Sequence, residues 1–268
     1  MYDETVERRI SVPVLSKEEI MRLAPATFTT SGSPDTGPSY TFIDTAQLIE
    51  ALRENGFYPT EASQSMRARR RLYARHMIRL RHEAEAGKVM GTMPEIILIN
   101  SHDKSSSFQL RGGLYRYICG SGMIVTLSEF GSILVPHRGN IIASIVDGAK
   151  RIANCFPSLN DTVERMARTE LSYQERLGYA EKVLQARFRT RETPPFGAAE
   201  LLASRRTADD GHDLWTTYNV VQENTLRGGV IGRTLKGKLR KTRAISGILE
   251  SIRLNLELWQ EAMRLIRV

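Results

Sequence analysis

The sequence predicts an α+β fold, with an antiparallel β-meander core followed by helices. Between Tyr73 and His137, short apolar stretches alternate with turns rich in glycine and polar residues. After Gly139, apolar residues recur every three or four positions, which is the period of an α-helix. Short connections between strands favour antiparallel pairing of neighbours, so the expected sheet is a meander.

The first 39 residues are expected to form a flexible arm. The stretch from Thr29 to Ser39 is rich in Ser, Gly and Pro, a composition typical of loops. Residues 40–268 are expected to form a single domain, sheet-rich over 40–140 and helical over 141–268. Asp44 is the predicted N-cap of its first helix, because Gln47 follows at the capping-box spacing.

The strand predicted over 73–82 has a strict alternation. Ala74, His76, Ile78 and Leu80 alternate with Arg75, Met77, Arg79 and Arg81. Because successive side chains point to opposite faces of a sheet, this pattern predicts a half-buried strand with arginines on its solvent face. Further strands are predicted over 95–99, 108–119, 123–127 and 133–137.

The C-terminal half contains several predicted helices, with a break at Thr193-Pro194-Pro195. They begin at residue 141 and cover 162–169, 173–188, 214–226 and 244–267. Asp213 and the pair Ser172 and Glu175 supply predicted caps. The last helix has a long apolar stripe, which can pack on the sheet of its own chain or on a second copy of the chain.

Charge is distributed unevenly along the sequence. The formal net charge is +8, and two tracts without any acidic residue, 66–82 and 224–249, carry seven cations each. Together they contribute 7 + 7 = +14, so the rest of the chain sums to 8 − 14 = −6. Two such tracts favour a nucleic-acid partner. An anionic membrane surface and an ordinary solvated surface are the alternatives.

The residues predicted to contact nucleic acid are mostly in these tracts. They are Arg67, Arg69, Arg70, Arg71, Arg75, Arg79, Arg81, Arg111, Arg116, Arg233, Lys236, Lys238, Arg240, Lys241 and Arg243. Arg111 and Arg116 lie near Tyr115 and Tyr117, and such aromatic rings can stack on bases. The same tyrosines are also typical of ordinary strands.

Two segments could carry catalysis. The first is Asn100-Ser101-His102-Asp103, together with His137, since a histidine and a carboxylate can bind a metal or transfer protons. The second is Asp209-Asp210-Gly211-His212-Asp213 with Gln222-Glu223-Asn224. Neither has a spacing with known mechanics, and such residues commonly cap turns. We therefore expect no catalytic site, no metal and no cofactor. An enzyme would use His102, Asp103, His137 and Glu223 in metal-dependent hydrolysis.

The sequence also bears on location. Cys119 and Cys155 are too few for a disulfide framework. The N-terminus lacks the layout of a signal peptide, and no apolar run approaches the roughly 18–20 residues of a membrane span. A cytoplasmic protein without membrane contact is expected.

Four phrases carry a resemblance to a known family. They are PEIILINSHD (94–103), GLYRYICGSG (113–122), RRTADDGHDLWTTYNVVQENTLRGG (205–229) and LNLELW (254–259). From about Tyr40 onward the chain resembles the plasmid- and prophage-borne family with a domain of unknown function that is typified by YafZ and YfjQ. The resemblance implies a mobile-element accessory protein, and such families are often found beside anti-restriction genes. It implies no residue roles. The order of elements is also similar to that of Rad52-type and phage single-strand annealing proteins, without a shared motif.

The leading functional hypothesis is a non-catalytic protein that binds single-stranded DNA and anneals it as a homo-oligomer, in recombination. Inhibition of a host defence system through a protein partner is the second hypothesis, and a metal-dependent nuclease or hydrolase is the third. A catalytic site requires convergence of its side chains, whereas a binder requires both basic tracts on one face.

Overall fold

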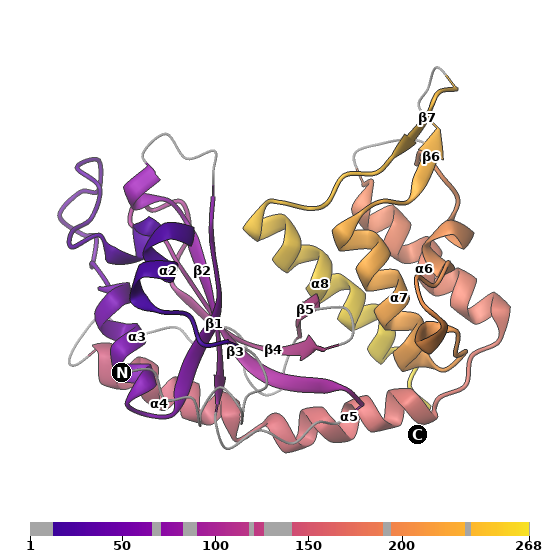
Figure 1. Cartoon of the computed structure of the whole chain (residues 1–268), viewed down its shortest axis with the longest axis horizontal. Coiled ribbons are helices and arrows are strands. Elements are labelled where there is room, and N and C mark those ends of the chain that lie inside the picture. Colours follow the sequence, from indigo (N-terminus) through magenta and orange to yellow (C-terminus); the bar gives the residue numbers. More distant parts are fainter. Residues whose placement is uncertain are drawn as a thin grey trace. The chain divides into compact units, whose positions relative to one another are not determined.

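The structure is a computed structural model that describes residues 13–65, 71–82, 90–117, 121–125, 141–189, 194–233 and 237–267. These residues form two compact units, with the boundary between Pro157 and Ser158. Figure 1 shows the sheet of the first unit and the helices of the second. Each unit is described separately below.

The first unit is built on a five-stranded antiparallel sheet in the order β1-β2-β3-β4-β5. The strands are β1 (Phe57–Gln64), β2 (His76–His82), β3 (Thr92–Asn100), β4 (Gln109–Arg116) and β5 (Ser121–Ile124). This topology confirms the predicted α+β meander. Strand β1 was not predicted, and the strand predicted over 133–137 lies outside the described residues.

Two helices of this unit contact each other and the sheet, α3 (Thr45–Arg53) and α4 (Ile141–Ala153). The Asp44 side chain accepts a hydrogen bond from the Gln47 amide at 2.9 Å, which confirms the predicted N-cap. The helices and the strands share an apolar core, because Leu48 and Leu52 of α3 and Ile78 of β2 are all fully buried.

The segment before the sheet is structured where it is described. Helix α2 (Lys17–Leu23) starts with a capping box between Ser16 and Glu19, and the 3₁₀ turn η1 (Pro25–Phe28) follows. Ile20 and Ala26 are buried in the core. Residues 13–39 therefore include part of the folded unit, although the sequence predicted a flexible arm there.

The predicted alternation of β2 is present, but its arginine face is not solvent-exposed. Arg79 and Arg81 are only 4% and 2% exposed. Met77, on the same face, is buried as well. The expectation of a solvent-facing row of arginines on this strand is therefore wrong.

The second unit is mainly helical. Its elements are α5 (Phe156–Arg168, starting just before the boundary), α6 (Tyr173–Arg187), η4 (Ala198–Leu202), η5 (Thr207–Asp209), α7 (Leu214–Arg227), β6 (Ile231–Arg233), β7 (Leu239–Lys241) and α8 (Ile248–Met263). The 3₁₀ turn η2 (Arg71–Tyr73) belongs to the first unit. Ser172 and Asp213 cap α6 and α7 as predicted.

Helix α8 is shorter than the predicted 244–267, and it packs against α6 and α7 of its own unit. Ile252, Leu258 and Trp259 are buried there, and the Trp259 ring meets the ring of Tyr218 edge-on, at 5.6 Å between centroids. The central part of its apolar stripe is thus covered within the unit. In the described parts of the chain, no helix has the length and hydropathy of a transmembrane span.

Candidate nucleic-acid interface

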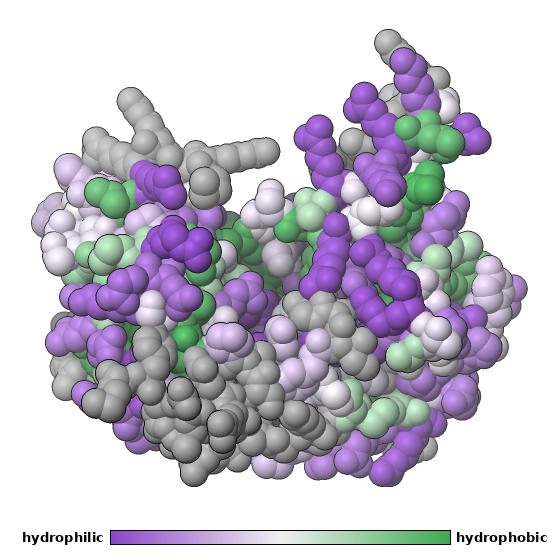
Figure 2. All heavy atoms as spheres, viewed as in Figure 1, coloured by the Kyte–Doolittle hydropathy of each residue, from purple (hydrophilic) through white to green (hydrophobic). Residues whose placement is uncertain are grey.

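An exposed cationic element of the second unit is the hairpin formed by β6 and β7, which projects from the helices of that unit (Figure 1). We call residues 228–233 and 237–243 the basic hairpin. Its exposed cations are Arg233, Lys238, Arg240, Lys241 and Arg243. Figure 2 shows hydrophilic side chains gathered over this element, with hydrophobic ones among them.

The two faces of the basic hairpin differ. Ile231 pairs with Lys241, and Arg233 pairs with Leu239, so these four side chains share one face. Ile231 and Leu239 are 57% and 62% exposed, which places this mixed face in solvent. The other face carries Gly232, which is buried so close to Pro195 that an added Cβ would lie 2.8 Å from its carbonyl oxygen.

Two arginines outside the hairpin hold its base. The Arg187 guanidinium donates to the carbonyl of Arg243 at 2.8 Å and to that of Asn224 at 3.3 Å. The Arg205 guanidinium donates to the carbonyl of Gly228 and, through Nε, to the Asn224 side chain at 2.9 Å. Gly228 ends α7 with a φ of 66°, a conformation that favours glycine. Hydrogen bonds from these two arginines therefore hold both ends of the basic hairpin.

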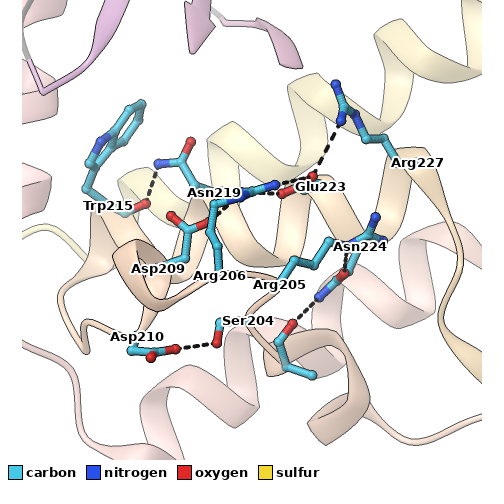
Figure 3. A network of polar contacts seen from close by, with 11 residues as sticks. Ser204, Arg205, Arg206, Asp209, Asp210, Trp215, Asn219, Glu223, Asn224 and Arg227 are labelled. Carbon is cyan, nitrogen blue, oxygen red and sulfur yellow. Dashed lines mark hydrogen bonds and ion pairs between the residues drawn. The ribbon is translucent and has the colours of Figure 1, made fainter. Parts of the chain in front are cut away.

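Arg205 belongs to a larger polar network (Figure 3). The neighbouring Arg206 forms a bidentate pair with Glu223, with both N–O distances at 2.8 Å, and also bonds Asp209. Glu223 is only 3% exposed, and Arg227 lies 3.5 Å from it. The hydrogen bonds that Arg206 donates to Glu223 raise the pKa of Arg206 above its ordinary value. This network fastens the segment that contains Arg205 to α7.

The second predicted catalytic segment is part of this scaffold. Asp210 accepts a hydrogen bond from Ser204, and Asp213 accepts one from the Thr216 amide at 2.8 Å. A polar cavity of about 300 Å³ lies beside these residues, with His212 and Thr217 in its wall. The carboxylates of Asp209, Asp210, Asp213 and Glu223 all have structural partners. This agrees with the structural alternative to catalysis that the sequence left open.

The first predicted catalytic segment lies at the end of β3. His102 is fully buried, with its ring 4.9 Å from that of Phe42 and 5.1 Å from that of His76. Burial lowers the pKa of His102 to about 4, so the ring is neutral at pH 7. Asp103 accepts a hydrogen bond from the Ser105 amide at 2.9 Å, as in a capped turn. His137 lies outside the described residues.

The arginines of the sheet are engaged within the first unit. Arg79 bonds Glu95 and lies 3.6 Å from Glu61. The Arg81 guanidinium stacks 3.7 Å above the Tyr115 ring and lies 3.7 Å from Glu95. These two side chains are not available to a large ligand, because both are buried.

The remaining predicted contacts of the first unit vary in exposure. Arg71 is exposed, Arg75 donates to the Ser105 carbonyl, Arg111 donates to Gln109 at 2.9 Å, and Arg116 is buried. Arg67, Arg69, Arg70 and Lys236 lie outside the described residues. Of the two basic tracts, the second therefore provides the exposed set of cations on one described element. Among the described residues, no three His, Cys, Asp or Glu side chains cluster as metal ligands would.

Comparison with known proteins places the chain in a family. The model of a domain of unknown function, DUF932, matches residues 35–259. The chain belongs to the DUF932 family. Two relatives in Escherichia coli K12 are the UPF0380 proteins YfjQ and YafZ. Each is 36% identical to the chain, over 255 and 256 residues, and each alignment covers 94% of this chain and 92% of the relative. No solved structure matches.

This result confirms the resemblance found in the sequence. The residues matched by the DUF932 model include the basic hairpin, Arg187 and the whole network of Figure 3. Sequence reasoning about this DUF932 chain found the hairpin cations but missed Arg187, Arg205 and Arg206. The adjacent arginines beside Asp209 and Asp210 were the available signal, since such a mixture of charges is typical of an ion-pair network.

Proposed function

We propose that this DUF932 protein binds nucleic acid through the basic hairpin. The observation that carries the proposal is the exposure of Arg233, Lys238, Arg240, Lys241 and Arg243 on one small element. The surrounding stretch, 224–249, contains no acidic residue. A cation next to a phosphate releases condensed counterions, which is the main source of affinity for nucleic acid.

The alternative of a solvated surface explains this element less well. Surfaces that serve solubility usually mix both signs of charge, because like charges at short distance repel each other. Here the cations are concentrated, and Ile231 and Leu239 are exposed among them. The two aliphatic side chains give this face apolar area that a ligand can cover in addition to its charge.

The fixed base of the hairpin also supports binding. Arg187 and Arg205 hold the two ends of the hairpin through the carbonyls of Arg243 and Gly228. Ordering a flexible loop on binding costs free energy, and a hairpin that is already held avoids part of that cost. The cations are thus presented on a preorganised element.

The other hypotheses have less support from the described residues. Single-strand annealing was expected to use the arginines of both basic tracts, and two of these, Arg79 and Arg81, are buried. A hydrolase would need an open site, whereas His102 is buried and Glu223 is paired with Arg206. Inhibition of a host defence protein remains the second candidate, because a basic hairpin can also occupy the nucleic-acid site of such a protein.

Fluorescence anisotropy with labelled oligonucleotides tests the proposal. We expect binding whose affinity falls by roughly 10²–10⁵ between about 50 and 200 mM salt, as for proteins that contact several phosphates. Replacing Arg233, Arg240 and Lys241 together with alanine should reduce the slope of log affinity against log salt by about 2–3 for duplex DNA. A wild-type protein that binds no nucleic acid at low salt would refute the proposal.

A matched control removes the same charge elsewhere. Lys150, Arg151 and Arg165 are exposed on α4 and α5, outside the basic hairpin. Their triple alanine variant should bind as the wild type does. Equal losses in both variants would mean that net charge alone, and not the hairpin, determines binding.

A further inference from the structure

We infer that the basic hairpin binds duplex DNA, as a two-stranded ribbon lying in the major groove, in preference to a single strand. This inference rests on the proposed function and names its substrate class. The argument comes from the placement of cations on the two strands, from the residues between them and from the dimensions of the hairpin.

Each strand of the hairpin carries its own cation on the solvent face. Arg233 is on β6 and Lys241 is on β7, at diagonal positions of the four-residue face. A groove of duplex DNA has a phosphate backbone on each side, so a ribbon lying in it meets phosphates along both edges. A single strand offers only one phosphate chain, which would leave one of the two edges without a partner.

Aliphatic side chains occupy the other two positions of this four-residue face. Ile231 and Leu239 are exposed beside the cations. In the major groove, apolar side chains can contact the methyl group of thymine. In contact with a single strand, the usual partner of a base is an aromatic ring on which it stacks.

The sequence of the hairpin contains no such ring. From Gly228 to Ile245 there is no Phe, Trp, Tyr or His. The two tyrosines that the sequence suggested for stacking, Tyr115 and Tyr117, belong to the first unit. The Arg81 guanidinium covers the Tyr115 ring, and the partly buried Tyr117 ring meets it edge-on. The chemistry of the hairpin therefore suits a groove better than unstacked bases.

The dimensions agree with a groove as well. Two hydrogen-bonded strands lie about 4.8 Å apart, so a two-stranded ribbon is narrow enough to lie in the major groove, which is about 12 Å wide. The major groove of double-stranded RNA is deep and narrow and does not admit such an element. Duplex DNA is thus preferred over duplex RNA.

The decisive experiment compares three ligands of equal length at one low salt concentration: a mixed-sequence single strand, the corresponding DNA duplex and the RNA duplex. We expect the DNA duplex to bind at least about tenfold more tightly than the other two, since only that ligand contacts both edges of the ribbon. A single strand bound as tightly as the DNA duplex, or more tightly, would overturn the inference and leave the proposed function intact.

Variants identify the mode of contact. Arg233→Ala and Lys241→Ala should each lower the salt slope for duplex DNA by about 0.9, because each removes one phosphate contact. The double variant Ile231→Ala and Leu239→Ala should weaken duplex binding severalfold without changing the salt slope. Unchanged affinity of this double variant would contradict insertion of the ribbon.

Two further controls separate the possible failures. Thermal unfolding of each variant shows whether the fold is retained, and the alanine variants of Lys150, Arg151 and Arg165 serve again as charge controls. A protein that binds none of the three nucleic acids but binds vesicles of anionic lipid would refute the proposed function itself, and with it this inference.

Discussion

At the scale of single residues, His76 has a fully satisfied environment in the core of the first unit. Its Nδ1 lies 3.0 Å from the carbonyl of Ala74, so this nitrogen carries the hydrogen. Its Nε2, 3.0 Å from the Thr45 hydroxyl, then accepts from that hydroxyl. The Thr45 oxygen in turn accepts from the Asn100 amide at 2.9 Å. The neutral ring is thus the form that the core stabilises.

This environment predicts a pH dependence of stability. Burial lowers the pKa of His76 to about 4, below the ordinary value of about 6.5 in an unfolded chain. Below pH 6.5 the unfolded chain therefore takes up a proton that the folded chain does not. Stability should fall as the pH decreases from 6.5 towards 4, by at most about 3 kcal/mol from this residue.

Urea unfolding at several pH values between 7.5 and 4.5 measures this loss. His76→Gln should be less stable than the wild type at neutral pH, because it perturbs the bonds to Thr45 and Ala74. Its stability should nevertheless depend less steeply on pH. Parallel pH profiles for the two proteins would show that His76 is not responsible.

Arg206 gives a second prediction at this scale. Glu223 is almost completely buried, and removing the bidentate partner would leave it, among the described cations, with Arg227 at 3.5 Å. Arg206→Ala should therefore lower the free energy of unfolding by about 3 kcal/mol, as for other broken buried pairs. Arg227→Ala, at a half-exposed side chain, should cost less than about 1 kcal/mol. Equal costs in chemical denaturation would contradict this assignment.

At the scale of elements, the caps of α3, α6 and α7 and the alternation of β2 could be predicted from the sequence, because they depend on neighbouring residues. Strand β1 could not. It contains Pro59 and lies at the edge of the sheet, with an irregular register between Pro59 and Glu61. The burial of Arg79 could not be predicted either, because its partner Glu95 lies on the next strand and no local pattern in the sequence indicates such a pair.

The candidate site was predictable in part for a similar reason. The cations of the basic hairpin stand out in the sequence, because a tract without acids is a local signal. The strands β6 and β7 do not, since each has only three residues and no apolar period. The roles of Arg187 and Arg205 depend on bonds to residues 19–56 positions away, which no spacing rule predicts.

The end of α7 supplies the prediction at this scale. An alanine Cβ at Gly228 would lie 2.6 Å from the backbone of Arg243, at a φ that disfavours side chains. Gly228→Ala should therefore displace the base of the basic hairpin and weaken nucleic-acid binding without removing a charge. Anisotropy titrations measure the affinity.

Gly178 of α6 is the matched control. Beyond the neighbouring backbone of α6, no described atom would lie within 4 Å of a Cβ at this position. Gly178→Ala should raise the free energy of unfolding by about 0.5–1 kcal/mol, because alanine favours the helix. Its affinity for nucleic acid should stay unchanged. A normal affinity of the Gly228 variant would show that the base need not be fixed.

At the scale of the whole molecule, the structure leads to a prediction of the oligomeric state. The apolar stripe of α8 was one possible joint between subunits, but its central residues are buried and the helix packs against α6 and α7 of the same chain. We therefore expect light scattering at micromolar concentration to give the mass of a monomer, with and without a single-stranded oligonucleotide. A larger assembly formed with the oligonucleotide would contradict this expectation and favour the annealing hypothesis.

The way in which the hairpin is held has a consequence for its variation. Arg187 and Arg205 reach its two ends through main-chain carbonyls, those of Arg243 and Gly228. Every residue type offers the same carbonyl, so the exposed side chains between these ends are free to change without loss of the attachment. The helical unit therefore holds the hairpin by its two ends, and this attachment does not depend on the exposed side chains between them. New side chains at the exposed positions between residues 230 and 242, with Gly232 kept because a Cβ there would meet Pro195, should change what the hairpin binds while the fold stays the same.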